Sequence, residues 1–163
     1  MIASPPPVYP WPIGPGPRYR PPAANVAVLA GRPLAAMRCS RGGRHFAVHV
    51  ELFANRRVIV VPRRIGVARS GCRYPLSTSV PTGVVDVSYG PRYTLGDLFR
   101  VWGGALTRSK LVSFRGPVSV FVGGRRFVGD PRRVPLTRHA QIVVELGHYV
   151  APHVIYVFPK GAG

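Results

Sequence analysis

Two histidines near the start of a predicted strand have the spacing of metal ligands. His45 and His49 lie four residues apart, so in a strand both side chains point to the same face. Together with Cys72 or Asp86 they could form a three-ligand site, because imidazole, thiolate and carboxylate groups all bind transition metals. Half-buried histidines without a ligand are the simpler interpretation. We keep His45, His49 and Asp86 as weak metal candidates and expect no bound metal.

The side chains that enzymes commonly use do not form a catalytic pattern in this chain. There are only five Asp and Glu residues, and Asp97 and Asp130 fall in a predicted helix cap and a predicted turn. A mechanism with paired carboxylates is therefore not supported. Ser77 and Ser79 lack the glycine-flanked setting of a serine nucleophile, and no glycine-rich segment matches a phosphate-binding loop. We predict a protein that is not an enzyme and has no cofactor.

Arginine pairs recur at corresponding places in two predicted hairpins. Residues 53–65 align without gaps on residues 122–134, at an offset of 69 residues. Both copies read as a turn, an Arg-Arg pair, a strand, a Pro-Arg-Arg stretch and a β-branched residue. If the hairpins are adjacent, these arginines form one surface able to follow a phosphate backbone. Chance similarity in an arginine-rich chain is the alternative. The predicted nucleic-acid contacts are Arg56, Arg57, Arg63, Arg64, Arg125, Arg126, Arg132 and Arg133.

The charge balance of the chain points to an anionic partner. The 163 residues include 23 Lys and Arg but 5 Asp and Glu, which gives a formal net charge of +18. Such an excess costs stability through self-repulsion, and a polyanion such as nucleic acid would relieve it. A GC-rich genome explains arginine in place of lysine. It does not explain so few acids, because Asp and Glu also have GC-rich codons.

Nothing in the sequence predicts membrane insertion or a secretory signal. No apolar run approaches the ~20 residues of a membrane-spanning helix. The first residues show neither the basic nor the apolar region of a signal peptide. We expect a cytoplasmic protein without a transmembrane segment. Cys39 and Cys72 form no CxxC pattern, and either one disulfide or two free thiols is compatible with the sequence.

Residues 1–43 are predicted to be an extended arm and a transition to the domain. Nearly half of the 19 prolines fall within residues 1–24, which excludes a helix or a sheet interior there. Aromatic and arginine side chains are interspersed, and solvated linkers usually lack aromatics. A solvated tail is the alternative to an arm that docks on a partner. The predicted docking residues are Tyr9, Trp11, Arg18 and Arg20.

Residues 44–163 are predicted to form one β-rich domain, with related hairpins at about 50–67 and 118–136. One helix is predicted over residues 95–102, because Thr94 and Asp97 form a capping pattern and glycine follows at 103. We predict an α+β fold, mainly antiparallel β-sheet with one short helix, for which the β-grasp is one candidate. Strands are expected at Val26–Leu29, His45–Phe53, Val58–Val61, Val84–Tyr89, Val118–Val122, Phe127–Val128, Gln141–Leu146 and Val154–Phe158.

Several short motifs follow one another in an order that resembles a known family. They include Cys72 with Tyr74 and Leu76, Thr94-Leu95-Gly96-Asp97-Leu98-Phe99 with Trp102-Gly103, Gly116-Pro117-Val118, Gly129-Asp130-Pro131-Arg132, and Phe158-Pro159. On these motifs, residues 44 to about 161 resemble an uncharacterised bacterial family of hypothetical proteins that are often exported. The resemblance covers about 70% of the chain and identifies a fold more than an activity.

The resemblance implies a metal site that this chain has lost. Relatives carry a His-x-His, a Leu-His-Thr-His-Asp stretch and a later His before an acid, a set that suits a metal. The corresponding positions here are Ala47 with His49, residues 76–80, and Asp86 with Ser88. Only His49 remains a good ligand, and Asp86 is a weak substitute. The resemblance therefore implies a fold reused for binding.

These observations together favour a non-catalytic protein that binds the backbone of RNA or DNA, as a structural subunit of a ribonucleoprotein or nucleoprotein assembly. One alternative is a subunit of a protein assembly, such as a filament, envelope complex or capsid, docked on other subunits through the N-terminal arm. A second alternative is a metal-binding module that uses His49.

Overall fold

The computed structural model describes residues 8–9 and 31–163 of the chain. Val8–Tyr9 form the short strand β1, which pairs with an edge of the domain. The arm residues Trp11, Arg18 and Arg20 lie outside the described residues, as does the strand expected at 26–29. The predicted arm and transition, residues 1–43, are thus described only at β1 and at residues 31–43.

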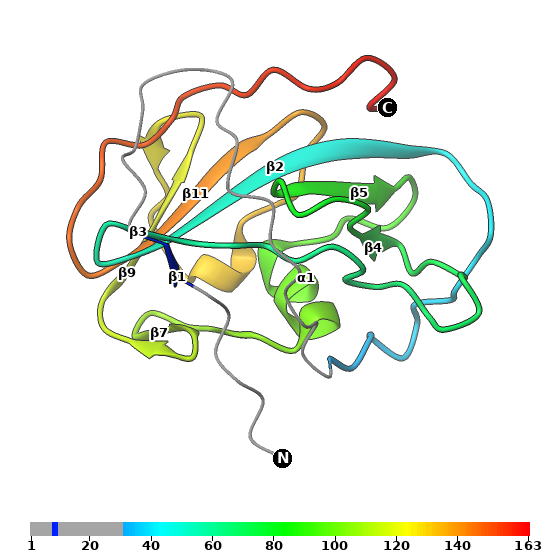
Figure 1. Cartoon of the computed structure of the whole chain (residues 1–163), viewed down its shortest axis with the longest axis horizontal. Coiled ribbons are helices and arrows are strands. Elements are labelled where there is room, and N and C mark those ends of the chain that lie inside the picture. Colours follow the sequence, from blue (N-terminus) through cyan, green and yellow to red (C-terminus); the bar gives the residue numbers. More distant parts are fainter. Residues whose placement is uncertain (1–7, 10–30) are drawn as a thin grey trace.

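One mixed β-sheet forms the centre of the domain (Figure 1). Strand β2 (His45–Ala54) turns into β3 (Arg57–Ile59), and β9 (Val118–Val122) turns into β10 (Arg125–Arg126). The last strand, β11 (Gln141–Leu146), lies between the two hairpins, parallel to β2 and antiparallel to β9. The order β1-β3-β2-β11-β9-β10, with a helix in the connection between the hairpins, is that of a β-grasp. The predicted α+β fold, mostly β-sheet with one short helix, is confirmed.

Strand β2 is long enough to pair with two strands along one edge. Its residues 45–49 pair with β5 (Val84–Ser88), and its residues 52–54 pair with β3. Strand β5 pairs in turn with β4 (Leu76–Ser77). The first half of β2 therefore carries a short side sheet. The remaining elements are β6 (Ala105–Leu106), β7 (Lys110–Val112), β8 (Phe114–Arg115) and the 3-10 helix η1 (Pro131–Arg133).

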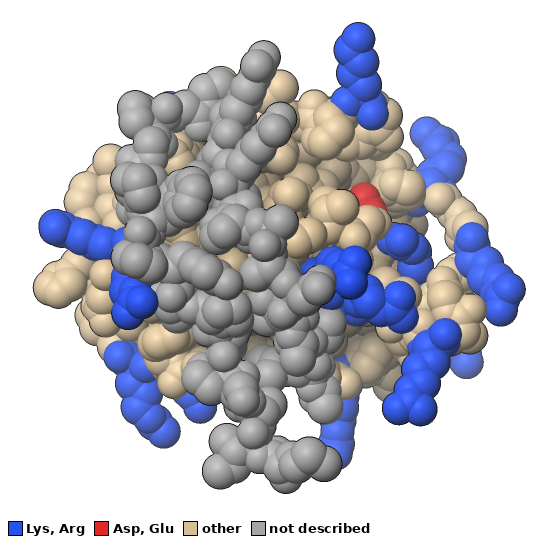
Figure 2. All heavy atoms as spheres, viewed as in Figure 1, with Lys and Arg blue, Asp and Glu red and all other residues tan. Residues whose placement is uncertain are grey.

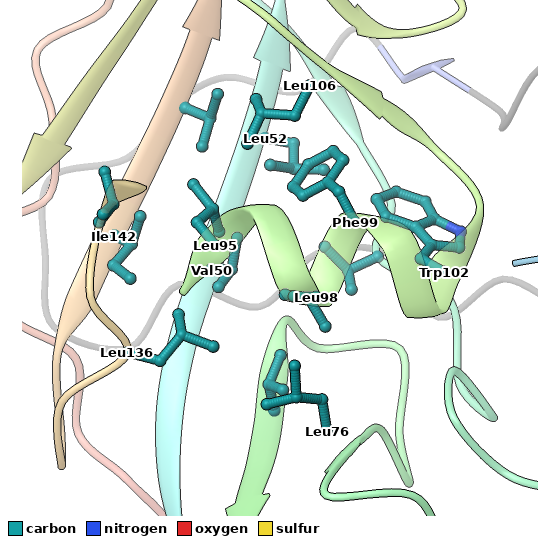
Figure 3. Packing of buried hydrophobic residues seen from close by; sticks show 14 of the residues in the cluster. Val50, Leu52, Leu76, Leu95, Leu98, Phe99, Trp102, Leu106, Leu136 and Ile142 are labelled. Carbon is teal, nitrogen blue, oxygen red and sulfur yellow. The ribbon is translucent and has the colours of Figure 1, made fainter. Parts of the chain in front are cut away.

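The predicted helix is confirmed as α1 (Leu95–Trp102). The Thr94 hydroxyl accepts the Asp97 N–H at 3.3 Å, and the Asp97 carboxylate accepts the Thr94 N–H at 2.9 Å, which completes the capping box. Gly103 ends the helix at φ 93°, in the left-handed region that glycine enters without strain. The apolar side of α1 packs on the sheet to form the main core (Figure 3). Its members include Val50, Leu52, Leu76, Leu95, Leu98, Phe99, Trp102, Leu106, Leu136 and Ile142.

Two of the predicted strands are wrong. The turn of the second hairpin, Gly123 and Gly124, places Arg125–Arg126 opposite β9, so the return strand ends before Phe127–Val128. Val154–Phe158 has no regular secondary structure. Its Tyr156 and Phe158 rings stack on His49 and His139, so the segment crosses a face of the sheet and does not pair with an edge strand.

The C-terminal segment, residues 147–163, covers the sheet face opposite α1 (Figure 1). The His153 Nδ1–H donates to Glu51 Oε2 at 2.7 Å, and the Tyr156 ring stacks on His49 with the ring centroids 3.6 Å apart. Gln141 Nε2 donates to the other Glu51 oxygen at 2.8 Å. Glu51 is 3% exposed, so these donors supply the hydrogen bonds that burial would otherwise remove.

A second buried acid, Glu145, lies on the same face. One carboxylate oxygen accepts the Val150 N–H at 3.2 Å, and among the described residues the other has no hydrogen-bond partner. Burial raises the pKa of Glu145 from 4.5 to about 7. The folded protein therefore keeps the Glu145 proton in a pH range where the unfolded chain has lost it.

We predict that Glu145→Gln removes a pH dependence of stability. In the wild type, the contribution of protonated Glu145 is complete below pH 4.5 and is lost as the pH rises to about 7, because the folded-state pKa is the higher one. The glutamine stays neutral and can accept the same Val150 N–H. Urea unfolding should show the variant gaining about 2–3 kcal/mol on the wild type between pH 4.5 and 8. A constant difference between the two proteins would contradict the prediction.

Candidate anion-binding site

The two arginine-bearing hairpins lie at opposite sides of the sheet. Strand β11 separates β2 from β9, so the hairpins are not adjacent. Ala54 and Val118 both pair with Leu146, whereas Val122 pairs with Ile142 at the other end of β11. The two hairpin tips therefore point to opposite ends of the sheet. A single arginine surface required adjacent hairpins, and the hairpins are not adjacent. The eight predicted arginines therefore do not form one surface.

The two hairpins also differ by one residue in register. The first turn is formed by Asn55 and Arg56, with φ angles of 49° and 64°, and the second by Gly123 and Gly124, with φ angles of 56° and 79°. Arg56 therefore corresponds to Gly124, an offset of 68 residues instead of 69. Arg125 follows its turn directly, as Arg57 does, so the matched arginine pairs are not equivalent in space.

One of the eight arginines is held by an acid. Arg132 donates to the Asp130 carboxylate from Nε at 3.1 Å and from a terminal nitrogen at 2.7 Å. These hydrogen bonds lower the pKa of Asp130 to about 2, with Arg108 adding a weaker effect. Arg133 lies in η1 beside α1. Arg132 and Arg133, which follow the second hairpin, therefore have different neighbours: Asp130 for the first and α1 for the second.

A pocket of about 400 Å³ lies elsewhere, beside the side sheet of β4 and β5. Its walls come from residues 38–45, 73–79 and 86–88. Three arginines line it: Arg38, Arg41 and Arg73. With the single acid Asp86 the fixed charge is three minus one, or +2 when His45 is neutral. A concave site with this charge suits an anion.

Three contacts bring the arginines of this pocket together. Met37 is 7% exposed and belongs to the main core, which anchors the chain just before Arg38. Cys39 and Cys72 form a disulfide, with Cα atoms 5.6 Å apart. Ser40 and Arg73 exchange two backbone hydrogen bonds of 2.8 Å. The segment with Arg38 and Arg41 is therefore fixed against the segment with Arg73.

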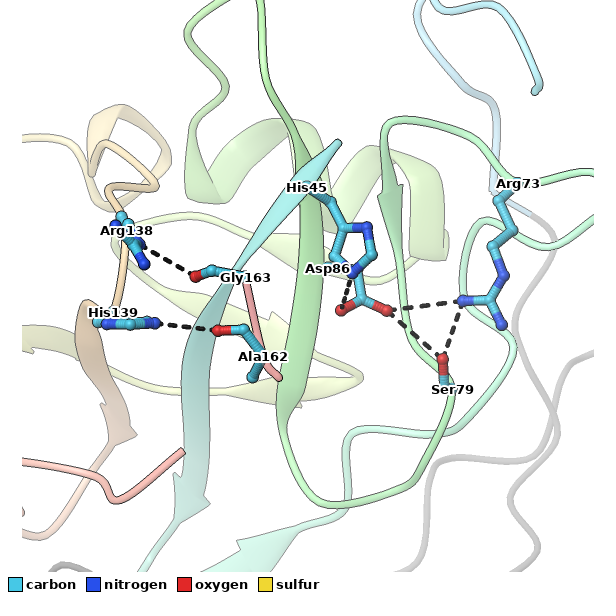
Figure 4. Close-up of polar contacts among 8 residues, drawn as sticks. All are labelled: His45, Arg73, Ser79, Asp86, Arg138, His139, Ala162 and Gly163. Carbon is cyan, nitrogen blue, oxygen red and sulfur yellow. Dashed lines mark hydrogen bonds and ion pairs between the residues drawn. The ribbon is translucent and has the colours of Figure 1, made fainter. Parts of the chain in front are cut away.

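Asp86 orients Arg73 within the pocket (Figure 4). An Arg73 terminal nitrogen lies 3.5 Å from Asp86 Oδ2 and donates to the Ser79 hydroxyl at 2.8 Å. The Ser79 hydroxyl lies 3.4 Å from the same carboxylate oxygen, and His45 Nε2 lies 3.7 Å from the other. Arg73 is thus set in one direction, whereas Arg38 makes no hydrogen bond or ion pair with another described residue.

Of the positions that the family resemblance assigned to a metal site, four line this pocket, whereas Ala47 and His49 do not. Ala47 and Ser77 both pair with Asp86 in the side sheet, and Ser77, Ser79, Asp86 and Ser88 line the pocket. Serine hydroxyls and one carboxylate now occupy this place. Among residues 8–9 and 31–163, no three His, Cys, Asp or Glu side chains are grouped to hold a metal ion.

His49 does not line this pocket. Its Nδ1 lies 2.7 Å from Gln141 Oε1 and its Nε2 lies 2.9 Å from the Thr82 carbonyl, so both ring nitrogens face protein oxygens. Burial has the largest effect on the pKa of His49 and lowers it. His45 and Asp86 remain close to each other, but His49 does not join them.

Sequence reasoning missed Arg38, Arg41 and Arg73. The available signal was their position next to the cysteines, in Arg38-Cys39-Ser40-Arg41 and Cys72-Arg73. Pairing of the cysteines brings together the two segments that carry these arginines. The sequence left the pairing open, so this consequence could not be drawn.

Comparison with protein-family models, curated proteins and solved structures finds no match for this chain. In the described part of the chain, no helix has the length and apolar character needed to cross a membrane.

We predict that the Cys39–Cys72 disulfide is a major source of stability. It closes a loop with a sequence separation of 33, for which loop-closure entropy corresponds to about 3–4 kcal/mol. The double variant Cys39→Ser/Cys72→Ser should lose about this much free energy of unfolding in urea. Wild-type protein treated with a reductant is the matched control and should behave like the variant. Equal midpoints for oxidised and reduced wild type would refute the prediction.

Proposed function

We propose that the protein binds the phosphate backbone of nucleic acid without catalysis, as a structural subunit of a nucleoprotein assembly. The observation that carries the proposal is the pocket of Arg38, Arg41 and Arg73, a site with a net positive charge in a chain of net charge +18. Guanidinium groups bind phosphate oxygens through paired, charge-assisted hydrogen bonds.

The acids of the chain have little capacity to neutralise its surface. Asp86 and Asp130 each pair with an arginine. Asp97 is used in the cap of α1, and Glu51 and Glu145 are buried on the second sheet face. Each of the five acids is therefore either buried or engaged by a neighbouring group, and the 23 Lys and Arg leave a strongly positive surface.

On the face of the molecule seen in Figure 2, the basic side chains are distributed along the rim. These Lys and Arg side chains gather on the side of β4, β5 and the loops next to them. A surface of this kind supports several phosphate contacts without base-specific contacts. The proposal therefore concerns the backbone of RNA or DNA and no particular sequence.

A protein-assembly subunit is the second candidate, and the pairing of β1 favours it. Val8–Tyr9 add an antiparallel strand to β3 at the edge of the sheet. Residues 10–44 lie between β1 and β2, so the same pairing could be made with a neighbouring copy, as in strand exchange. An oligomer that resists high salt and is lost on removal of residues 1–24 would favour this candidate over nucleic-acid binding.

The disulfide bears on the cellular location of the protein. Disulfides persist in oxidising compartments and are rare in the cytosol. The Cys39–Cys72 bond therefore weighs against the cytoplasmic location expected from the sequence and favours an exported protein.

A salt titration tests nucleic-acid binding. If about six phosphates are contacted, the logarithm of the binding constant should fall with log[salt]. The expected slope is about −5 on duplex DNA and about −4 on single strands. Fluorescence anisotropy with labelled oligonucleotides of mixed sequence measures this slope. A slope near zero, or absence of binding at low salt, would rule out the proposed function.

A further inference from the structure

We propose that the pocket of Arg38, Arg41 and Arg73 binds a terminal phosphate monoester of a nucleic-acid strand in preference to the diesters within the strand. This inference rests on the proposed function, because it names the part of the nucleic acid that the same site recognises. Three properties of the pocket carry it: its charge, its size and the direction of its donors.

The charge of the pocket matches a monoester. A phosphate monoester carries a charge of about −1.5 to −2 at pH 7, whereas a backbone diester carries one negative charge. Three guanidinium groups and the Asp86 carboxylate give the pocket a fixed charge of +2. A diester would leave part of this charge without a counterion, and a monoester would not.

The size of the pocket suits a chain end. Ligand pockets range from about 300 to 1,000 Å³, and 400 Å³ is near the lower limit. The pocket is lined by three separate segments, 38–45, 73–79 and 86–88. This volume has room for a phosphate with one attached nucleoside. An internal diester would need space for the strand on both of its sides.

The donors of the pocket are available and partly pre-oriented. Asp86 and Ser79 fix Arg73, and Arg38 has no hydrogen-bond or ion-pair partner among the described residues. Arg41 has one long contact, from a terminal nitrogen to the Ser70 carbonyl at 3.4 Å. A guanidinium carries five N–H donors, so most of the donors of Arg38 and Arg41 remain available for phosphate oxygens.

The Cys39–Cys72 disulfide helps to hold these donors close to one another. Arg38 and Arg41 flank Cys39 and Ser40, and Arg73 follows Cys72 directly. The pocket has arginines on both sides only while these two segments are held together. Recognition of the monoester therefore depends on this cross-link together with the backbone hydrogen bonds between Ser40 and Arg73.

The test compares short single-stranded oligonucleotides that differ only at their ends. One carries a 5′-phosphate, one a 3′-phosphate and one has hydroxyl groups at both ends. Wild-type protein should bind at least one phosphorylated strand about tenfold more tightly than the hydroxyl strand, measured by anisotropy at fixed salt. The two phosphorylated strands distinguish which end the pocket takes.

Two matched variants locate the effect. Arg38→Gln/Arg41→Gln should abolish the preference for phosphorylated ends. Arg125→Gln/Arg126→Gln removes the same charge from the second hairpin and should weaken binding to all strands while keeping the preference. All four arginines are exposed, and equal urea midpoints will confirm that both variants fold.

The outcomes separate this inference from the proposed function. Equal, salt-dependent affinity for all three strands would overturn the monoester site and leave backbone binding intact. A preference that survives in Arg38→Gln/Arg41→Gln would also overturn it. If no strand binds, the proposed function is wrong. Titration with adenosine monophosphate then tests whether the pocket binds a phosphate monoester by itself. Binding of adenosine monophosphate to the wild type that is lost in Arg38→Gln/Arg41→Gln supports the monoester site. Absence of binding to the wild type overturns the monoester site.

Discussion

Strand β2 is the element on which the rest of the structure depends, because it pairs on both of its edges along its length. It lies beside β11 on one edge and beside β5 and then β3 on the other. Side chains alternate along a strand, so Val48, Val50 and Leu52 enter the core under α1. His49 and Glu51 face the other way and hold the C-terminal segment. One strand therefore builds both the apolar core and the buried polar network.

The same strand places the candidate site. The first half of β2 pairs with β5, which brings Asp86 beside Ala47, and β4 then brings Ser77 beside Asp86. The disulfide adds the arginine segments to this side sheet. The pocket is therefore assembled from three parts of the chain around a rigid strand pair, an arrangement in which a side chain such as Arg73 can be held in one direction.

The excess of positive charge lowers the stability of the folded protein. Two of the five acids, Glu51 and Glu145, are buried inside the domain, where they do not pair with the surface arginines. Repulsion among surface arginines favours expansion of the chain, and a cross-link between distant segments opposes it. Anion binding would lower the same repulsion. The disulfide and a bound anion would therefore act in the same direction on stability.

The sequence by itself determined the elements whose signals are local. The Thr94 cap, the apolar spacing of α1 and the Gly123-Gly124 turn are read from adjacent residues, and each depends on contacts within a few positions. Tertiary structure decided the rest: the parallel pairing of β2 with β11, the separation of the two hairpins, the Cys39–Cys72 bond and the docking of Val154–Phe158 across a face. These features join residues that are far apart in the chain. The arginines predicted from a local repeat are therefore spread out, whereas Arg38, Arg41 and Arg73 meet in one pocket, because position in space is set by strand order and cross-linking and not by distance along the sequence.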